Sequence, residues 1–117
     1  IEAAGRFYDK VMGTIALKRT EDFGSVLFYG TGEPQSPVFI IMTPYDEQAA
    51  TSGNGTHVAL IAPARAAVDE FHKVALAEGG NCEGEPGLRP HYGPNYYAAY
   101  IRDLDGNKLQ AVCYRNQ

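Results

Sequence analysis

The feature that most constrains this chain is an internal repeat at a spacing of 63 residues. The aligned pairs are Ala3-Ala4 with Ala66-Ala67, Tyr8 with Phe71, and Lys10-Val11 with Lys73-Val74. Both segments carry apolar residues at helical spacing, so each half of the chain is predicted to contribute one amphipathic helix. A duplicated unit of this kind cannot bury its own sheet face alone, and we therefore expect the two copies to pair.

The two halves differ in what precedes the helix. The apolar spacing predicts one helix that ends near Gly13 and another that begins after Pro63 and ends at Gly79-Gly80. Runs rich in β-branched and aromatic residues predict strands at 15–19, 25–29, 38–43, 56–62, 81–84, 96–102 and 108–114. Only the second helix has a strand ahead of it. If the halves are equivalent, the first of eight strands is expected ahead of Ile1 and is apparently absent from the given sequence.

The expected fold class is α+β, with paired β-α-β-β-β modules forming a curved mixed sheet around a cavity. At 117 residues the chain is long enough for one domain with a substantial core. We expect residues 1–46 to form the first module, which lacks its first strand, and residues 56–117 to form the second. Residues 47–55, a polar stretch that ends at Asn54-Gly55, are expected to be the linker.

The composition argues against several classes of partner. The net charge is −4, and the Lys and Arg residues are scattered, so no nucleic-acid partner is expected. The longest apolar runs, such as 38–42, are far shorter than the roughly 20 residues that span a bilayer, so no membrane partner is expected either. Nothing accompanies Cys82 and Cys113 that indicates secretion, which favours reduced thiols in a cytoplasmic protein.

A loop ahead of the penultimate predicted strand is dense in hydrogen-bonding side chains. Polar groups held by a rigid scaffold are where function concentrates. The predicted substrate-binding residues are Arg89, His91, Tyr92, Asn95, Tyr96 and Tyr97. Pro90 and Pro94 stiffen this loop, in which His91 is either a general base or anion contact, or a structural cap. The alternative for the whole loop is a tyrosine-rich cover over one end of the sheet, and no residue is assigned a catalytic role.

The acidic stretch before the last strand invites a calcium hypothesis, because Asp103, Asp105 and Asn107 alternate like the start of an EF-hand loop. No acidic residue closes a twelve-residue loop, and the flanks are strand-like instead of helical. The sequence therefore predicts a tight hairpin turn at Asp105-Gly106.

Two segments together resemble a known family. They are THVALIAPARAAVDEFH at 56–72 and GLRPHYGPNYYAAYIRDLDGNKLQAVC at 87–113. They resemble the vicinal oxygen chelate superfamily, which includes glyoxalase I, bleomycin-resistance proteins, fosfomycin-resistance enzymes and extradiol ring-cleaving dioxygenases. The resemblance implies the paired-module fold, often completed by a homodimer. It also implies one divalent metal ion, held by His, Glu or Gln on the first, fourth, fifth and eighth strands, that acts as a Lewis acid on two neighbouring substrate oxygens.

The implied metal ligands are only partly present. His57 matches the ligand position on the fifth strand, and Gln110 stands on the last strand where relatives commonly have Glu. The fourth-strand position falls near Ile41, and residues 34–45 contain no acid and no histidine. His57 and Gln110 are thus the two candidate metal ligands, short of the three that a catalytic site usually has. The alternative for His57 is a histidine whose ring nitrogens are satisfied within the sheet.

Strand alternation assigns side chains to faces of the second module. If His57 and Gln110 point to the cavity, the residues that join them are Ala59, Ile61 and Val112. Those expected to pack toward the helices are Val58, Leu60, Leu109, Ala111 and Cys113. Parity does not decide whether Tyr96 or Tyr97 faces inward. His72 is expected to be partly exposed at the edge of its helix and poorly placed for chemistry.

Two functions follow from these residues and the resemblance. One is a glyoxalase-like or dioxygenase-like domain that acts on a small oxygenated metabolite as a lyase, isomerase or dioxygenase, with a divalent metal as its cofactor. The other is a non-catalytic small-molecule or drug-binding protein of the bleomycin-resistance type. A third hypothesis, an interaction domain that dimerises through its sheet, needs no cavity.

Overall fold

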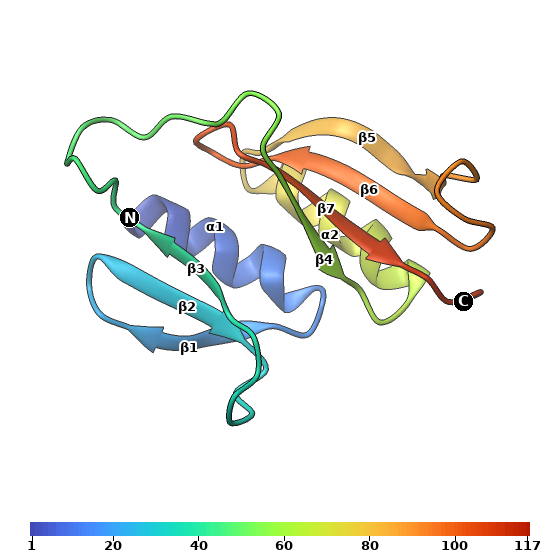
Figure 1. The fold of residues 1–117 in the computed structure, drawn as a ribbon, viewed down its shortest axis with the longest axis horizontal. Coiled ribbons are helices and arrows are strands. Elements are labelled where there is room, and N and C mark those ends of the chain that lie inside the picture. The colour runs from blue at the N-terminus through green and yellow to red at the C-terminus, as the bar shows by residue number, and fades with distance from the viewer.

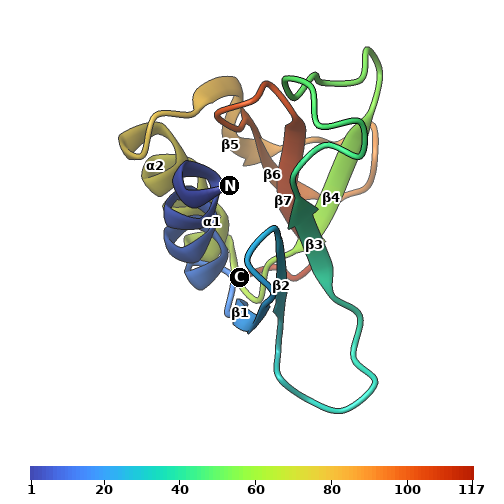
Figure 2. The same ribbon diagram turned by 90° about the vertical axis from the view of Figure 1, so that its left-hand side faces the viewer.

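The structure is a computed structural model that describes residues 1–117 (Figure 1). Its elements are α1 (Glu2–Gly13), β1 (Lys18–Asp22), β2 (Val26–Gly30), β3 (Phe39–Met42), β4 (His57–Ile61), α2 (Arg65–Ala77), β5 (Asn81–Leu88), β6 (Tyr97–Arg102) and β7 (Lys108–Cys113). The two helices form one layer on the same side of the strands, and the opposite side of the strands is open (Figure 2). The predicted α+β class is confirmed. Neither helix has the length and apolar character needed to cross a membrane.

The strands are divided between two sheets. Sheet A has the order β1-β2-β3 and is antiparallel, whereas sheet B has the order β4-β7-β6-β5 and is mixed, because β4 runs parallel to β7. Within residues 1–117 no strand stands beside β3 in the way that β4 stands beside β7. The facing edges of β3 and β4 therefore carry no strand partner.

The core lies between the helix layer and the strands. The apolar stripe of α1 is fully buried at Phe7, Val11 and Met12, and Phe71 of α2 is buried in the same cluster. Leu27 and Tyr29 of β2, Ile101 of β6 and Leu109 of β7 meet these side chains from the strands. Burying a large apolar side chain contributes about 1.5–3 kcal/mol, so this shared cluster holds the two modules together.

Three predictions about local structure are corrected. The predicted strand at 15–19 begins only at Lys18, because residues 14–16 form a tight turn after α1 in which Ala16 has φ 66°. The strand predicted at 81–84 extends to Leu88. His72 is buried, with 7 % of its surface exposed, because β5 follows the Gly79-Gly80 turn directly and runs across that side of α2. Both cysteines are free.

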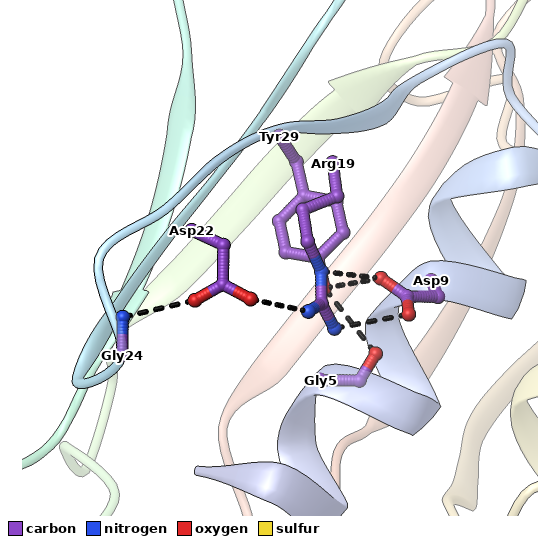
Figure 3. Close-up of polar contacts among 6 residues, drawn as sticks. All are labelled: Gly5, Asp9, Arg19, Asp22, Gly24 and Tyr29. Atoms are coloured by element: carbon purple, nitrogen blue, oxygen red, sulfur yellow. Dashed lines mark hydrogen bonds and ion pairs between the residues drawn. The ribbon is translucent and has the colours of Figure 1, made fainter.

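An ion-pair cluster joins α1 to β1 (Figure 3). Arg19 donates two hydrogen bonds to the Asp9 carboxylate, at 3.0 and 2.9 Å, and a third to Asp22 at 3.2 Å. Tyr29 donates to Asp9 as well, at 2.8 Å, and burial followed by this hydrogen bond raises the pKa of Tyr29 to about 12. Gly5 makes room for the guanidinium, because a Cβ there would lie 2.6 Å from Arg19 Nη2.

The predicted hairpin turn between β6 and β7 is confirmed, and it is built around a buried carboxylate. Asp103 Oδ1 accepts hydrogen bonds from the backbone N–H groups of Asp105 and Asn107, both at 2.9 Å. Its Oδ2 accepts from Asn107 Nδ2 at 3.0 Å and from the hydroxyl of Tyr8 in α1. This carboxylate therefore also links the second module to the first.

We expect Tyr8→Phe to lower the free energy of unfolding by about 1.5–3 kcal/mol, because it removes a buried hydrogen bond to a charged group. Asp103→Ala is expected to cost more, since it leaves the Tyr8 hydroxyl and the turn N–H groups without their acceptor. Urea denaturation measures both. The matched control is Asp105→Ala, an exposed change expected to stay within about 0.5 kcal/mol of the parent. Equal losses for Asp103→Ala and Asp105→Ala would contradict this role for the buried carboxylate.

Candidate functional site

The candidate site lies on the face of sheet B that the helices leave open. Side chains alternate between the two faces along each strand, as the sequence predicted. The core cluster contains Leu109, Ala111 and Cys113, and the partly buried Leu60 packs against it, which confirms that these residues face the helices. Val58 is the exception. It is 38 % exposed, because β4 is an edge strand whose free edge leaves this side chain uncovered.

The polar centre of this face is the side-chain amide of Gln110, which is 6 % exposed. The Tyr96 hydroxyl donates to Gln110 Oε1 at 2.7 Å, and Gln110 Nε2 lies 3.0 Å from His57 Nε2. With the amide nitrogen donating, His57 Nε2 is the acceptor and the ring proton sits on Nδ1. His57 is exposed on the edge strand β4. Partial desolvation, followed by the charges of Lys108 and Arg102, lowers the pKa of His57 and favours this neutral form.

A tyrosine ring and two cations stand beside this centre. The ring of Tyr100 meets that of His57 edge-on, with centroids 5.5 Å apart. Arg89 Cζ and Lys108 Nζ lie 5.3 and 5.5 Å from the centroid of the Tyr100 ring. Neither cation is within 4.0 Å of a carboxylate, whereas the nearby Arg102 is neutralised by an ion pair of its own. In a chain of net charge −4, this patch is locally positive.

The loop after β5 continues the same face as a chain of rings. Centroid distances are 4.1 Å from His91 to Tyr92, 5.2 Å from Tyr92 to Tyr96 and 5.4 Å from Tyr96 to Tyr114. A small cavity of about 160 Å³ lies here, and Asn95 is part of its wall. Most of the predicted substrate-binding residues therefore gather on one side of sheet B.

Tyr97 is the predicted residue that does not join them. Its hydroxyl donates to Asp69 of α2 at 2.6 Å, on the helix-covered side of the sheet. Parity left the choice between Tyr96 and Tyr97 open, and the structure places Tyr96 on the open face.

A larger cavity lies elsewhere, and it was not predicted from the sequence. It has a volume of about 680 Å³ and runs along β3 to the N-terminal end of α1, the loop at 43–56 and Val58. Neither His57 nor Gln110 lines it. The cavity follows the free edge of β3, which is the position that β4 occupies beside β7 in the second module. Lys108 borders both regions. We place the site at the Gln110 centre, because the hydrogen-bonded amide, His57 and Arg89 are there.

The Gln110 centre does not fit a complete divalent-metal site. His57 and Gln110 are neutral donors that hydrogen-bond to each other, and no Asp, Glu or Cys completes a three-residue group with His57. On β3, Ile41 packs against the core, so its neighbours Ile40 and Met42 present only apolar groups on the other side. Two neutral ligands fall short of the three protein ligands that a catalytic site usually provides.

Comparisons with known proteins agree with this fold. The family model of the Glyoxalase/Bleomycin resistance protein/Dioxygenase superfamily matches residues 1–111. A crystal structure of a glyoxalase/bleomycin resistance protein from Albidiferax ferrireducens is 36 % identical, with a TM-score of 0.83, and the match covers 97 % of this chain and 88 % of that one. The chain therefore belongs to this superfamily, which confirms the resemblance seen in the sequence.

More distant structures share the fold. Lactoylglutathione lyase from Agrobacterium tumefaciens is 23 % identical, with a TM-score of 0.60 and coverage of 96 % of this chain and 84 % of that one. A glyoxalase I mutant from Zea mays is 22 % identical, with a TM-score of 0.69 and coverage of 97 % and 42 %. At these identities the likeness extends to the fold alone. A comparison with curated protein sequences gave no match.

Proposed function

We propose that this chain is a small-molecule-binding domain that recognises an oxygenated, anionic ligand on the open face of sheet B without a metal ion at His57. The observation that carries the proposal is the Gln110 amide, which is bonded at one end by Tyr96 and at the other by His57. The oxygen and nitrogen of the Gln110 amide and Nε2 of His57 therefore each already have a protein partner. A metal would have to break that network to bind two neutral ligands.

The two cations beside Tyr100 supply the recognition chemistry. Arg89 and Lys108 flank the ring and have no carboxylate partner within 4.0 Å. Arg89 is held in place by hydrogen bonds to the backbone carbonyls of Glu85 and Leu88, at 2.7 and 3.5 Å. Unpaired, oriented cations beside aromatic rings suit a planar ligand that carries a carboxylate.

A catalytic function is the second candidate, with His57 as the observation in its favour. The neutral imidazole is held at the start of β4 with a lowered pKa, which suits a metal ligand or a proton acceptor. A lyase, isomerase or dioxygenase activity through a metal at His57 and Gln110 would need a further ligand from outside the residues described. A divalent metal whose binding depends on His57 would favour this candidate over the first.

We also propose that the open face is covered by a second copy of the chain. Ile40 and Met42 of β3 and Ile61 of β4 are 45 %, 58 % and 62 % exposed on this side. Exposed large apolar side chains on one side of a molecule favour an interaction site there. In a two-fold dimer the same patch meets itself, so one surface serves both chains.

Calorimetric titration with benzoate and with benzamide tests the proposed ligand class. The two probes have similar shapes and differ in charge, so we expect benzoate to bind about 10-fold more tightly, the gain from one charge-assisted hydrogen bond of about 1.4 kcal/mol. Lys108→Gln is expected to remove that preference. The matched control is Lys73→Gln, an exposed α2 lysine with no ion pair, which should leave it intact. Equal affinities for the two probes in the parent protein would overturn the anion-binding proposal.

Sedimentation velocity tests the dimer. We expect a species of twice the 12.7 kDa chain mass, and we expect Met42→Lys combined with Ile61→Lys to shift it to the monomer. Tyr45→Lys, which changes an 89 % exposed residue outside the strands, is the control and should leave the dimer intact. A parent protein that stays monomeric at high micromolar concentration would rule out the second copy.

A further inference from the structure

A second cluster of reactive side chains lies on the opposite, helix-covered side of sheet B. It consists of His72 from α2 and of Cys82 and Glu85 from β5. His72 Nε2 is 3.2 Å from Cys82 Sγ, and Cys82 Sγ is 3.7 Å from Glu85 Oε1. Donor atoms of all three lie within 4.8 Å of one another. The imidazole is buried, whereas the thiol and the carboxylate are exposed to solvent.

A β-bulge brings the two strand residues together. Side chains three residues apart on a regular strand point to opposite faces. The pairing of β5 with β6 shifts register between Cys82 and Gly84, which adds one residue to β5 at this point. Cys82 and Glu85 therefore point to the same side, toward α2.

His72, Cys82 and Glu85 form a triangle, and the internal repeat places an equivalent triangle of three other residues in the first module. The shift of 63 residues that aligns the helices carries Asp9, Arg19 and Asp22 onto His72, Cys82 and Glu85. The bulge is repeated too, since β1 shifts register between Arg19 and Glu21. In the first module these three positions form the ion-pair cluster of Figure 3. The backbone scaffold is shared, and only the chemistry of the side chains differs.

The residues that surround the two triangles also differ between the modules, in a way that matches the side chains they contact. Gly5, which makes room for the long Arg19 side chain, corresponds to the fully buried Val68 beside the short Cys82. The cross-strand partner of Arg19 is Tyr29, which donates to Asp9, whereas the partner of Cys82 is the apolar Ile101.

The second triangle is thereby left without a cation. No Lys or Arg nitrogen lies within 4.0 Å of the Glu85 carboxylate, although Arg19 neutralises both acids of the first triangle. Its donors are a thiol, an imidazole and a carboxylate, which is a set that Zn²⁺ and similar ions bind.

We propose that His72, Cys82 and Glu85 bind one transition-metal cation of the Zn²⁺ type, which takes the place that the Arg19 guanidinium holds in the first module. Ligand atoms 2.0–2.3 Å from a tetrahedral zinc ion lie about 3.3–3.6 Å from one another, close to the two contacts above. On binding, the Cys82 thiol releases its proton to solvent and ligates as the thiolate. The fourth coordination position faces solvent, where a water molecule completes the tetrahedron. The bound ion ties α2 to the edge strand β5.

A thiol–imidazole nucleophile is the competing explanation, and the placement of Glu85 argues against it. In such a site the carboxylate or amide orients the far nitrogen of the imidazole. Here Glu85 contacts the thiol instead, where its negative charge would oppose a free thiolate.

Cobalt titration of the chelator-stripped chain tests the metal site. Tetrahedral Co²⁺ bound to a thiolate gives intense visible absorption and a sulfur-to-cobalt charge-transfer band. We expect both at one equivalent of Co²⁺ per chain, with loss of the bands on addition of Zn²⁺. Cys82→Ser, a change at an exposed position, should abolish the charge-transfer band. Glu85→Gln should weaken Co²⁺ binding by about 10-fold or more, because loss of even an outer-shell partner costs that much.

Two control variants make the assignment specific. His57→Ala removes the polar centre of the other face, and Cys113→Ala removes the second thiol, so both should retain the charge-transfer band. The proposal is overturned if the parent chain shows no such band, or if the band survives Cys82→Ser. It is also overturned if Cys82 alkylates rapidly at neutral pH in the stripped protein and remains equally reactive with Zn²⁺ added, which would indicate a nucleophilic thiol.

Discussion

The arrangement of polar side chains on the open face of sheet B depends on the hydrogen bonds of one buried amide. Gln110 is 6 % exposed, and a polar group buried without partners costs about 1–3 kcal/mol. Tyr96 and His57 satisfy the two ends of the amide, and with the amide nitrogen donating, the imidazole is a neutral acceptor. The charged groups left on this face are Arg89 and Lys108, both without acidic partners. The proposed recognition of an oxygenated anion follows from this contrast: the neutral Gln110 amide has hydrogen-bond partners at both ends, whereas the two cations have no acidic partner.

The two repeated modules share one backbone arrangement but carry side chains of different chemistry. In each module a bulged strand carries two side chains to the helix, and one helix residue meets them. The first module joins these elements with ion pairs around Arg19, and the second offers donors for a metal around Cys82. Asp103 then links the modules through Tyr8, so the hairpin beside the candidate site is anchored in the first helix. The proposed ligand site and the proposed metal site thus occupy opposite sides of one sheet.

Much of this arrangement could be predicted from the sequence, because the repeat predicts both helices and the family resemblance assigns His57 and Gln110 to one site. Period-two alternation then places the other residues of their strands on one face or the other. The choice between Tyr96 and Tyr97 could not be predicted. Tyr96 directly precedes β6 and Tyr97 begins it, and alternation alone does not say which of two adjacent residues faces a given side. The burial of His72 was missed because β5 contains Gly84, Pro86 and Gly87 and lacks a strand-like alternation. The bulge that gathers the second cluster depends on strand pairing, which single residues do not encode. The family resemblance predicted the fold and the expected metal-ligand positions, but not the hydrogen bonds that the residues at those positions make.

The most direct test of the account is the tautomer of His57, measured by ¹⁵N NMR of the imidazole together with the side-chain amide of Gln110. We expect a neutral ring protonated at Nδ1, with a scalar coupling across the hydrogen bond from Gln110 Nε2 to His57 Nε2. Gln110→Ala should abolish the coupling, and Tyr97→Phe should leave it unchanged because that hydroxyl bonds Asp69 on the other side of the sheet. A ring protonated at Nε2, or a ring nitrogen shifted by a bound divalent metal, would contradict the metal-free centre on which the proposed function rests.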